Sequence, residues 1–87
     1  MKVEYSKKFL RQYNKLPAEV RDLAEEKEEI FKKDPFDSRL RTHKLKGKLN
    51  GLYSFSINYR YRIAFDFEGE NGKARFHAIG NHTIYER

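Results

Sequence analysis

The chain has 87 residues, no cysteine and a formal net charge of +6. A chain of this length can bury one modest core, so we expect a single domain over residues 1–87. The lack of cysteine excludes disulfides and thiolate metal sites, and no apolar run is long enough for a membrane span or a signal-peptide core, so we expect a cytoplasmic protein without a membrane-bound state.

The charges are segregated along the sequence. Residues 17–34 contain seven acids and four bases, whereas residues 38–65 contain no acid at all. The bases of this acid-free stretch are Arg39, Arg41, Lys44, Lys46, Lys48, Arg60 and Arg62. Such segregation favours a face that binds a polyanion, most often nucleic acid. The alternative is a solvated loop in which bases cluster by chance.

The first half of the sequence predicts a strand followed by two helices. Residues 2–5 have the alternation of a short strand. Ser6 is suited to cap a helix that runs to about Lys15, because its hydroxyl can accept a backbone N–H of the first turn. Pro17 is suited to be the first residue of a second helix that runs to about Lys33. We expect these helices to form an antiparallel hairpin.

The second half predicts a basic loop followed by three antiparallel strands. Residues 36–50 show no period and form the loop, with a short edge strand near residues 41–45. Alternation then predicts strands at about 53–57, 61–67 and 73–79. This order predicts an α+β fold, in which an N-terminal strand and a two-helix hairpin pack on one face of a mostly antiparallel twisted sheet.

The sheet face that the helices leave open is expected to be polar. By strand alternation it carries Ser54, Ser56, Arg60 and Arg62. The last strand leads into a segment with His82 and Tyr85. Arginine binds phosphate, and histidine and tyrosine hold or move protons, so these residue types together suggest a small ribonuclease built on a sheet.

Three segments resemble motifs of the RelE/ParE superfamily of bacterial toxin–antitoxin toxins, nearest to its YoeB-like and YafQ-like RNA-cleaving branch. They are LKGKLNGLYS at 45–54, INYRYRI at 57–63 and GNHTIY at 80–85. Together with the opening helices, they extend the resemblance over nearly the whole chain. The resemblance implies a RelE-like fold and the toxin of a type II system. The RNA-cleaving members cut messenger RNA in the ribosomal A site without a metal or a cofactor, by attack of the substrate's own 2′-OH on the adjacent phosphate.

The resemblance also implies roles for four residues. Arg62 matches the arginine that holds the scissile phosphate, and His43 matches the proposed general base. His82 matches the proposed general acid or a partner of the phosphate, and Tyr85 matches an aromatic that stacks on a base or orients the phosphate. Each has a structural alternative: an ion-paired strand arginine, a bystander loop histidine, or a tail that packs the chain end. The residues expected to grip the RNA backbone are Lys44, Lys46, Lys48 and Arg60.

The sequence departs from some family members at the expected site. Ser54 and Ser56 stand where the members nearest to RelE have lysines, and Ala78 stands where YafQ-like members have an arginine. His77, inside the last strand, is expected to be structural. These departures are compatible with a weakened toxin.

The resemblance leaves three functions open: a ribosome-dependent endoribonuclease, a ParE-like gyrase-inhibiting binding module, and a weakly active homologue that mainly binds its antitoxin. His43 and His82 favour the nuclease, because gyrase-binding members generally lack this acid/base set. Every alternative implies a cognate acidic antitoxin that offers an amphipathic helix to a basic, apolar groove. The nuclease also implies the ribosome and messenger RNA as partners.

Overall fold

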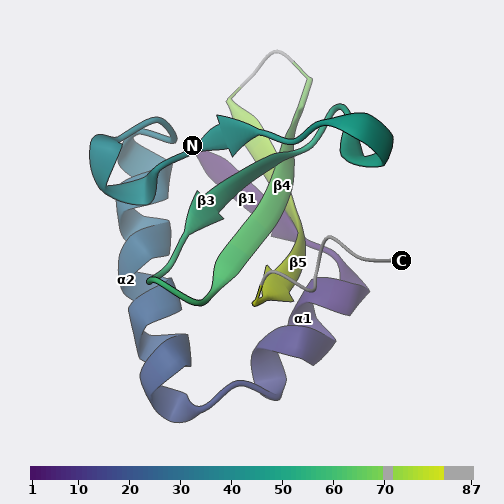
Figure 1. The fold of residues 1–87 in the computed structure, drawn as a ribbon. Helices are drawn as coiled ribbons and strands as arrows, with labels where there is room; N and C mark the ends of the chain where they lie inside the picture. The colour runs from purple at the N-terminus through teal and green to yellow at the C-terminus, as the bar shows by residue number, and fades with distance from the viewer. Residues whose placement is uncertain (70–71, 82–87) are drawn as a thin grey trace.

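The computed structural model describes residues 1–69 and 72–81 and shows the expected α+β arrangement (Figure 1). Two 3₁₀ turns, η1 and η2, accompany the helices and strands. In chain order the elements are β1 (Lys2–Tyr5), α1 (Lys7–Asn14), α2 (Ala18–Lys33), η1 (Ser38–Leu40), β2 (His43–Lys44), η2 (Gly47–Leu49), β3 (Tyr53–Ser56), β4 (Arg62–Glu68) and β5 (Lys73–Gly80). None of the helices in the described ranges is both long enough and apolar enough to cross a bilayer.

The five strands form one sheet in the order β1-β5-β4-β3-β2. β1 runs parallel to β5, and every other neighbouring pair is antiparallel. The mostly antiparallel sheet is therefore confirmed, and the short edge strand expected near residues 41–45 is β2. The N-terminal strand joins the far edge of the sheet from β2, which leaves β3 to β5 as the consecutive antiparallel strands predicted from the sequence.

The helix boundaries follow from local chemistry. Ser6 caps α1, since its Oγ accepts the Phe9 N–H at 2.9 Å, and the same hydroxyl donates to the His77 carbonyl of β5 at 2.9 Å. Pro17 is the N-cap of α2 and not its first residue, so that detail of the prediction was wrong. Its ψ of 149° is extended, and its carbonyl accepts the N–H groups of Val20 and Arg21.

The core lies between the helices and one face of the sheet. Phe31 of α2 is fully buried, and its ring lies 5.0 Å from Phe55, 4.8 Å from Phe65 and 5.2 Å from Phe76, measured between ring centroids. These three partners come from β3, β4 and β5. One helix residue therefore contacts three neighbouring strands, and this contact fixes α2 against the sheet.

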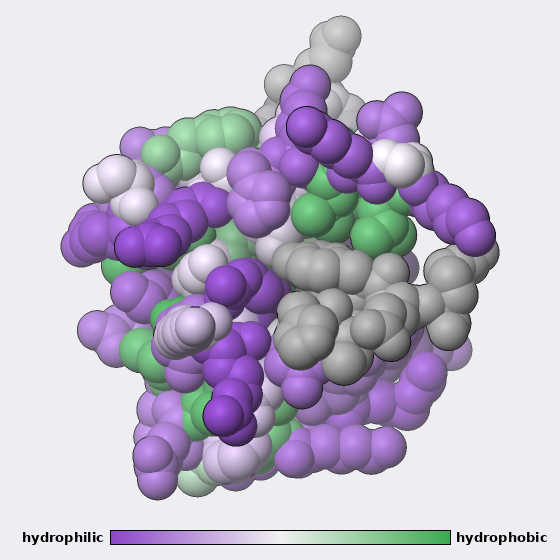
Figure 2. Space-filling model, in the orientation of Figure 1, coloured by the Kyte–Doolittle hydropathy of each residue, from purple (hydrophilic) through white to green (hydrophobic). Residues whose placement is uncertain are grey.

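The second face of the sheet is not the open polar face that the alternation predicted. Ser54 is fully buried and lies in register with Ala64 and Ala78, which are also buried. Leu45, Leu49 and Leu52, from the segment around η2, line a hollow of about 350 Å³ together with those two alanines. Figure 2 shows a hydrophobic area near the position of η2, with hydrophilic side chains around it. The basic loop thus folds its leucines over this part of the sheet.

We expect Phe31→Ala to lower the free energy of unfolding by about 3–5 kcal/mol, because it removes a buried ring and leaves a cavity among three others. Phe36→Ala is the matched control. The Phe36 side chain is 57% exposed, so this variant should lose less than half as much free energy of unfolding. Chemical denaturation of both variants measures the difference. Equal losses would show that Phe31 does not hold α2 on the sheet.

Candidate functional site

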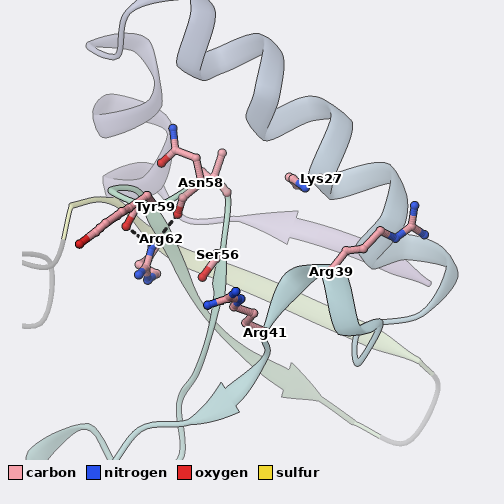
Figure 3. A pocket seen from close by; sticks show the side chains of 8 residues that line it. Lys27, Arg39, Arg41, Ser56, Asn58, Tyr59 and Arg62 are labelled. Carbon is pink, nitrogen blue, oxygen red and sulfur yellow. Dashed lines mark hydrogen bonds between the residues drawn. The ribbon is translucent and has the colours of Figure 1, made fainter.

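A pocket of about 570 Å³ opens between α2, the segment around η1, and the turn that joins β3 to β4 (Figure 3). We call it the basic pocket, because four of its lining residues are basic and none is acidic. The lining residues are Lys27, Arg39, Arg41, Ser56, Ile57, Asn58, Tyr59 and Arg62. The acid-free stretch supplies all of them except Lys27, so the charge segregation predicted most of this surface.

Arg62 is held at the pocket by backbone carbonyls. It is the first residue of β4 and lies in register with Ser56 of β3. Its Nη1 donates to the carbonyl oxygens of Asn58 at 2.7 Å, Tyr59 at 3.1 Å and Tyr61 at 3.2 Å. Among the described residues, no carboxylate forms an ion pair with Arg62. The guanidinium is therefore fixed in direction while it keeps its full charge.

The turn that supplies these carbonyls is built on Asn58. Its Oδ1 accepts the backbone N–H groups of Arg60 at 2.9 Å and Tyr61 at 2.8 Å, a local bond pattern that asparagine favours in turns. Arg60 therefore lies exposed in the turn and not on a strand face, which corrects the prediction. Tyr59 is 88% exposed at the pocket. An exposed aromatic ring beside cations is a platform on which a nucleic-acid base can stack.

His43 faces the same side of the sheet as Arg62. It lies in register with Ser54, whereas Arg62 lies in register with Ser56, and residues two apart on a strand share a face. From the strand spacing and rise, the His43 and Arg62 Cα atoms are about 12 Å apart. Two long side chains can approach one ligand across that distance. The expected pairing of a base with a phosphate-binding arginine is thus compatible with the register.

The contact made by His43 sets which ring nitrogen carries the proton. Its Nδ1 lies 3.1 Å from the carbonyl oxygen of Arg41. A carbonyl oxygen only accepts, so Nδ1 must donate, and in the neutral imidazole Nε2 is then left without a proton. The side chain is exposed, which makes Nε2 accessible. A general base needs such an unprotonated and accessible nitrogen.

Arg39 differs from the other bases of the pocket because it is paired within its own segment. Its Nε and Nη2 donate to the two carboxylate oxygens of Asp37, each at 2.9 Å. This bidentate contact, with the Arg39 backbone N–H, lowers the pKa of Asp37 to about 2 and raises the pKa of Arg39. Figure 3 shows Arg39 directed away from Arg41. The charge available to a ligand therefore comes mainly from Lys27, Arg41 and Arg62.

The loop lysines lie apart from the basic pocket. Lys44, Lys46 and Lys48 are exposed, and none of them lines it. Lys44 lies in register with Tyr53, so it points to the opposite side of the sheet from His43. None of the four residues expected to grip RNA, these lysines and Arg60, therefore lines the basic pocket.

Lys27 and Tyr59 are lining residues that the sequence analysis did not single out. Lys27 is a base in an acid-rich helix, but it falls three residues after Ala24 and four before Phe31, both buried. That helical spacing places it on the stripe that faces the sheet. Tyr59 follows Asn58, a turn residue between two strands, which could have marked it as exposed.

His82 and Tyr85 lie outside the described residues, so their expected roles stay predictions. His77 lies on β5, with its Nε2 3.1 Å from the Asp66 Oδ1, and it is not part of the basic pocket. This placement fits the structural role expected for it. In the described ranges, no group of three or more His, Cys, Asp or Glu residues is arranged to hold a metal ion.

Comparison with known proteins relates the chain to a group of toxins by structure. No family model and no curated protein matches the sequence. The YoeB/ParE toxin from Agrobacterium tumefaciens matches with a TM-score of 0.80 and 19% identity, over 94% of this chain and 99% of that one. YafQ from E. coli matches with a TM-score of 0.77 and 14% identity, over 98% and 97%.

A third match links the fold to a complex. A chain of the heterotetrameric YoeB–YefM toxin–antitoxin complex from Staphylococcus aureus has a TM-score of 0.75 and 16% identity, over 94% of this chain and 97% of that chain. At such low identities the likeness concerns the fold, and in all three cases it extends over nearly the full length of both chains. The protein therefore has the fold of the RelE/ParE superfamily toxins, as its motifs predicted.

Proposed function

We propose that this protein is the toxin of a bacterial type II toxin–antitoxin system and that it is a metal-independent endoribonuclease, which cleaves messenger RNA on the ribosome in the cytoplasm. One observation carries the proposal. On a single face of the sheet, a carbonyl-anchored Arg62 keeps its charge at a basic pocket, and His43 Nδ1 contacts the Arg41 carbonyl, which leaves Nε2 as the unprotonated nitrogen of the neutral imidazole. A cation for a phosphate and a base for a hydroxyl are two of the three groups that such cleavage needs.

The proposed reaction is an internal displacement at phosphorus. His43 Nε2 takes the proton of the 2′-OH, and the 2′-oxygen attacks the adjacent phosphorus as the bond to the 5′-oxygen breaks. The products are a 2′,3′-cyclic phosphate and a free 5′-hydroxyl. Arg62 donates to the non-bridging oxygens, where charge develops in the transition state. His82 is proposed to protonate the departing 5′-oxygen, and Tyr85 to orient the phosphate or stack on a base.

The surface around the site supports binding of a single RNA strand. Lys27 and Arg41 line the basic pocket, and Tyr59 supplies an exposed ring beside it. Exposed bases outside the basic pocket add sequence-independent attraction to the backbone of messenger or ribosomal RNA. They are Lys44, Lys46, Lys48 and Arg60. We propose that they contribute to affinity and not to the chemical step.

The proposed protein partner is a cognate acidic antitoxin. The YoeB structure that this chain resembles is a complex with YefM. An acidic segment would complement the charge of the basic pocket and block access to Arg62. This partner would also be needed if the chain were a gyrase-binding module or a weakly active homologue.

We expect Arg62→Ala to reduce cleavage by about 100- to 1000-fold, because it removes a preorganised donor to the developing charge. Arg62→Lys should recover only part of the activity, since an ammonium group lacks the planar fork of donors. Primer extension on a message translated in a reconstituted system measures the cuts. Arg11→Ala, the same change on α1 outside the basic pocket, is the matched control and should cleave normally. A wild-type protein that leaves the message intact but stalls supercoiling by gyrase would favour the binding-module alternative.

We expect His43→Gln to lower the cleavage rate by about 100- to 10,000-fold, the usual contribution of a general base. The wild-type rate should fall as the pH is lowered and the imidazole gains a second proton, and this acid limb should be absent in the variant. His77→Gln is the control, since it changes the other described histidine outside the basic pocket. An unchanged acid limb in His43→Gln would exclude His43 as the base.

A further inference from the structure

Arg41 has an unusual backbone conformation. It follows η1 with φ 53° and ψ 42°, in the left-handed region. Among the described residues it is the only non-glycine residue with a positive φ. Residues with a Cβ seldom adopt this conformation unless the surrounding structure requires it, and such outliers gather at functional sites.

The segment on either side of Arg41 is firmly held, which explains how the conformation is maintained. Leu40 is fully buried in the core. The Thr42 hydroxyl donates to the Pro35 carbonyl at 2.5 Å, and the Arg41 N–H donates to the Ser38 carbonyl at 3.4 Å. With both neighbours anchored, the chain must reverse at Arg41 itself.

This reversal directs both the backbone carbonyl and the side chain of Arg41 to the candidate site. The carbonyl oxygen of Arg41 receives the Nδ1 proton of His43 at 3.1 Å. The side chain of Arg41 enters the basic pocket, where it extends towards Ser56 (Figure 3). Unlike Arg39, it forms no ion pair with a carboxylate in the described part of the chain. Its charge is therefore left for a ligand that also meets Arg62.

We propose that Arg41 acts twice at this site. Its backbone carbonyl is a positioning group that keeps the proton of His43 on Nδ1 and leaves Nε2 as the base. Its guanidinium is a second phosphate-binding arginine, opposite Arg62 in the basic pocket. The inference rests on the proposed nuclease function for its role in cleavage, but the proton position and the binding of phosphate can each be measured without cleavage.

In the described part of the chain, His43 has the Arg41 carbonyl as its hydrogen-bond partner. Arg62 lies on the same face of the sheet as His43. Asp66 lies two residues beyond Ala64 on β4 and therefore also belongs to that face. Asp66 is engaged with His77 of β5. The charged groups on the face of His43 that can affect its pH profile are therefore Arg41, Arg62 and the Asp66–His77 pair. Lys44, the next residue of β2, lies on the opposite face.

The test uses two variants that differ by one methyl group, Arg41→Gly and Arg41→Ala. Both lose the guanidinium, but only glycine adopts a positive φ without a steric penalty. Binding is measured with an RNA oligonucleotide that carries a 2′-deoxy substitution at the cleaved position, at several salt concentrations. We expect both variants to bind more weakly by a similar factor, and the slope of log affinity against log salt to fall by about one, as for the loss of one phosphate contact. Wild-type affinity and slope in Arg41→Gly would overturn the binding role.

The positioning role of the Arg41 carbonyl is tested on the imidazole ring of His43. Nitrogen NMR of His43 should show the proton on Nδ1 in the wild type and in Arg41→Gly, and a shift towards Nε2 in Arg41→Ala. In single-turnover cleavage at saturating RNA, Arg41→Ala should be slower than Arg41→Gly by about tenfold or more, because His43 is no longer held in position to act as the base. The acid limb of the pH–rate profile should also shift in Arg41→Ala. The same tautomer and rate in both variants would overturn the positioning role. If the wild type cleaves no RNA, the nuclease proposal fails, while the NMR and binding results still decide the two roles of Arg41.

Discussion

The packing of Phe31 against the phenylalanines of three adjacent strands is the contact on which the rest of the molecule depends. It fixes the height and the rotation of α2 above the sheet. Because Lys27 lies one turn earlier on the same stripe as Phe31, this rotation also brings a cation from an acidic helix to the basic pocket. The core contact and the composition of the site are therefore consequences of one helix orientation.

Two of the candidate catalytic groups, Arg62 and His43, are oriented by backbone carbonyls. Arg62 is held by three carbonyls of the turn before β4, and His43 by the carbonyl of Arg41. A carbonyl dipole sets the direction of a donor without cancelling its charge, whereas a carboxylate would neutralise it. The contrast with Arg39, whose charge is matched by Asp37, shows the difference within one pocket. Orientation by carbonyls therefore leaves the positive charge available to an anionic ligand.

The acid-free stretch serves two separate purposes in the fold. Its arginines at 39, 41 and 62 line the basic pocket, while the loop lysines are exposed elsewhere around the sheet. In the same segment as those lysines, Leu45, Leu49 and Leu52 lie over part of the second face of the sheet. Basic residues and partly buried leucines thus occur in one segment, and the charge of the segment hid its packing role.

The order of the elements, the cap at Ser6, the alternation of the strands and the segregation of charge could all be derived from the sequence, because each depends on neighbours close in the chain. The sequence also placed Arg62 and His43 among the candidate site residues. The folded structure was needed to show that Ser54 is buried, that Arg60 belongs to a turn, and that Lys27 and Tyr59 join the site. These outcomes depend on strand register and on how a loop closes over a sheet. Both are set by contacts between residues far apart in the chain, which local patterns do not encode.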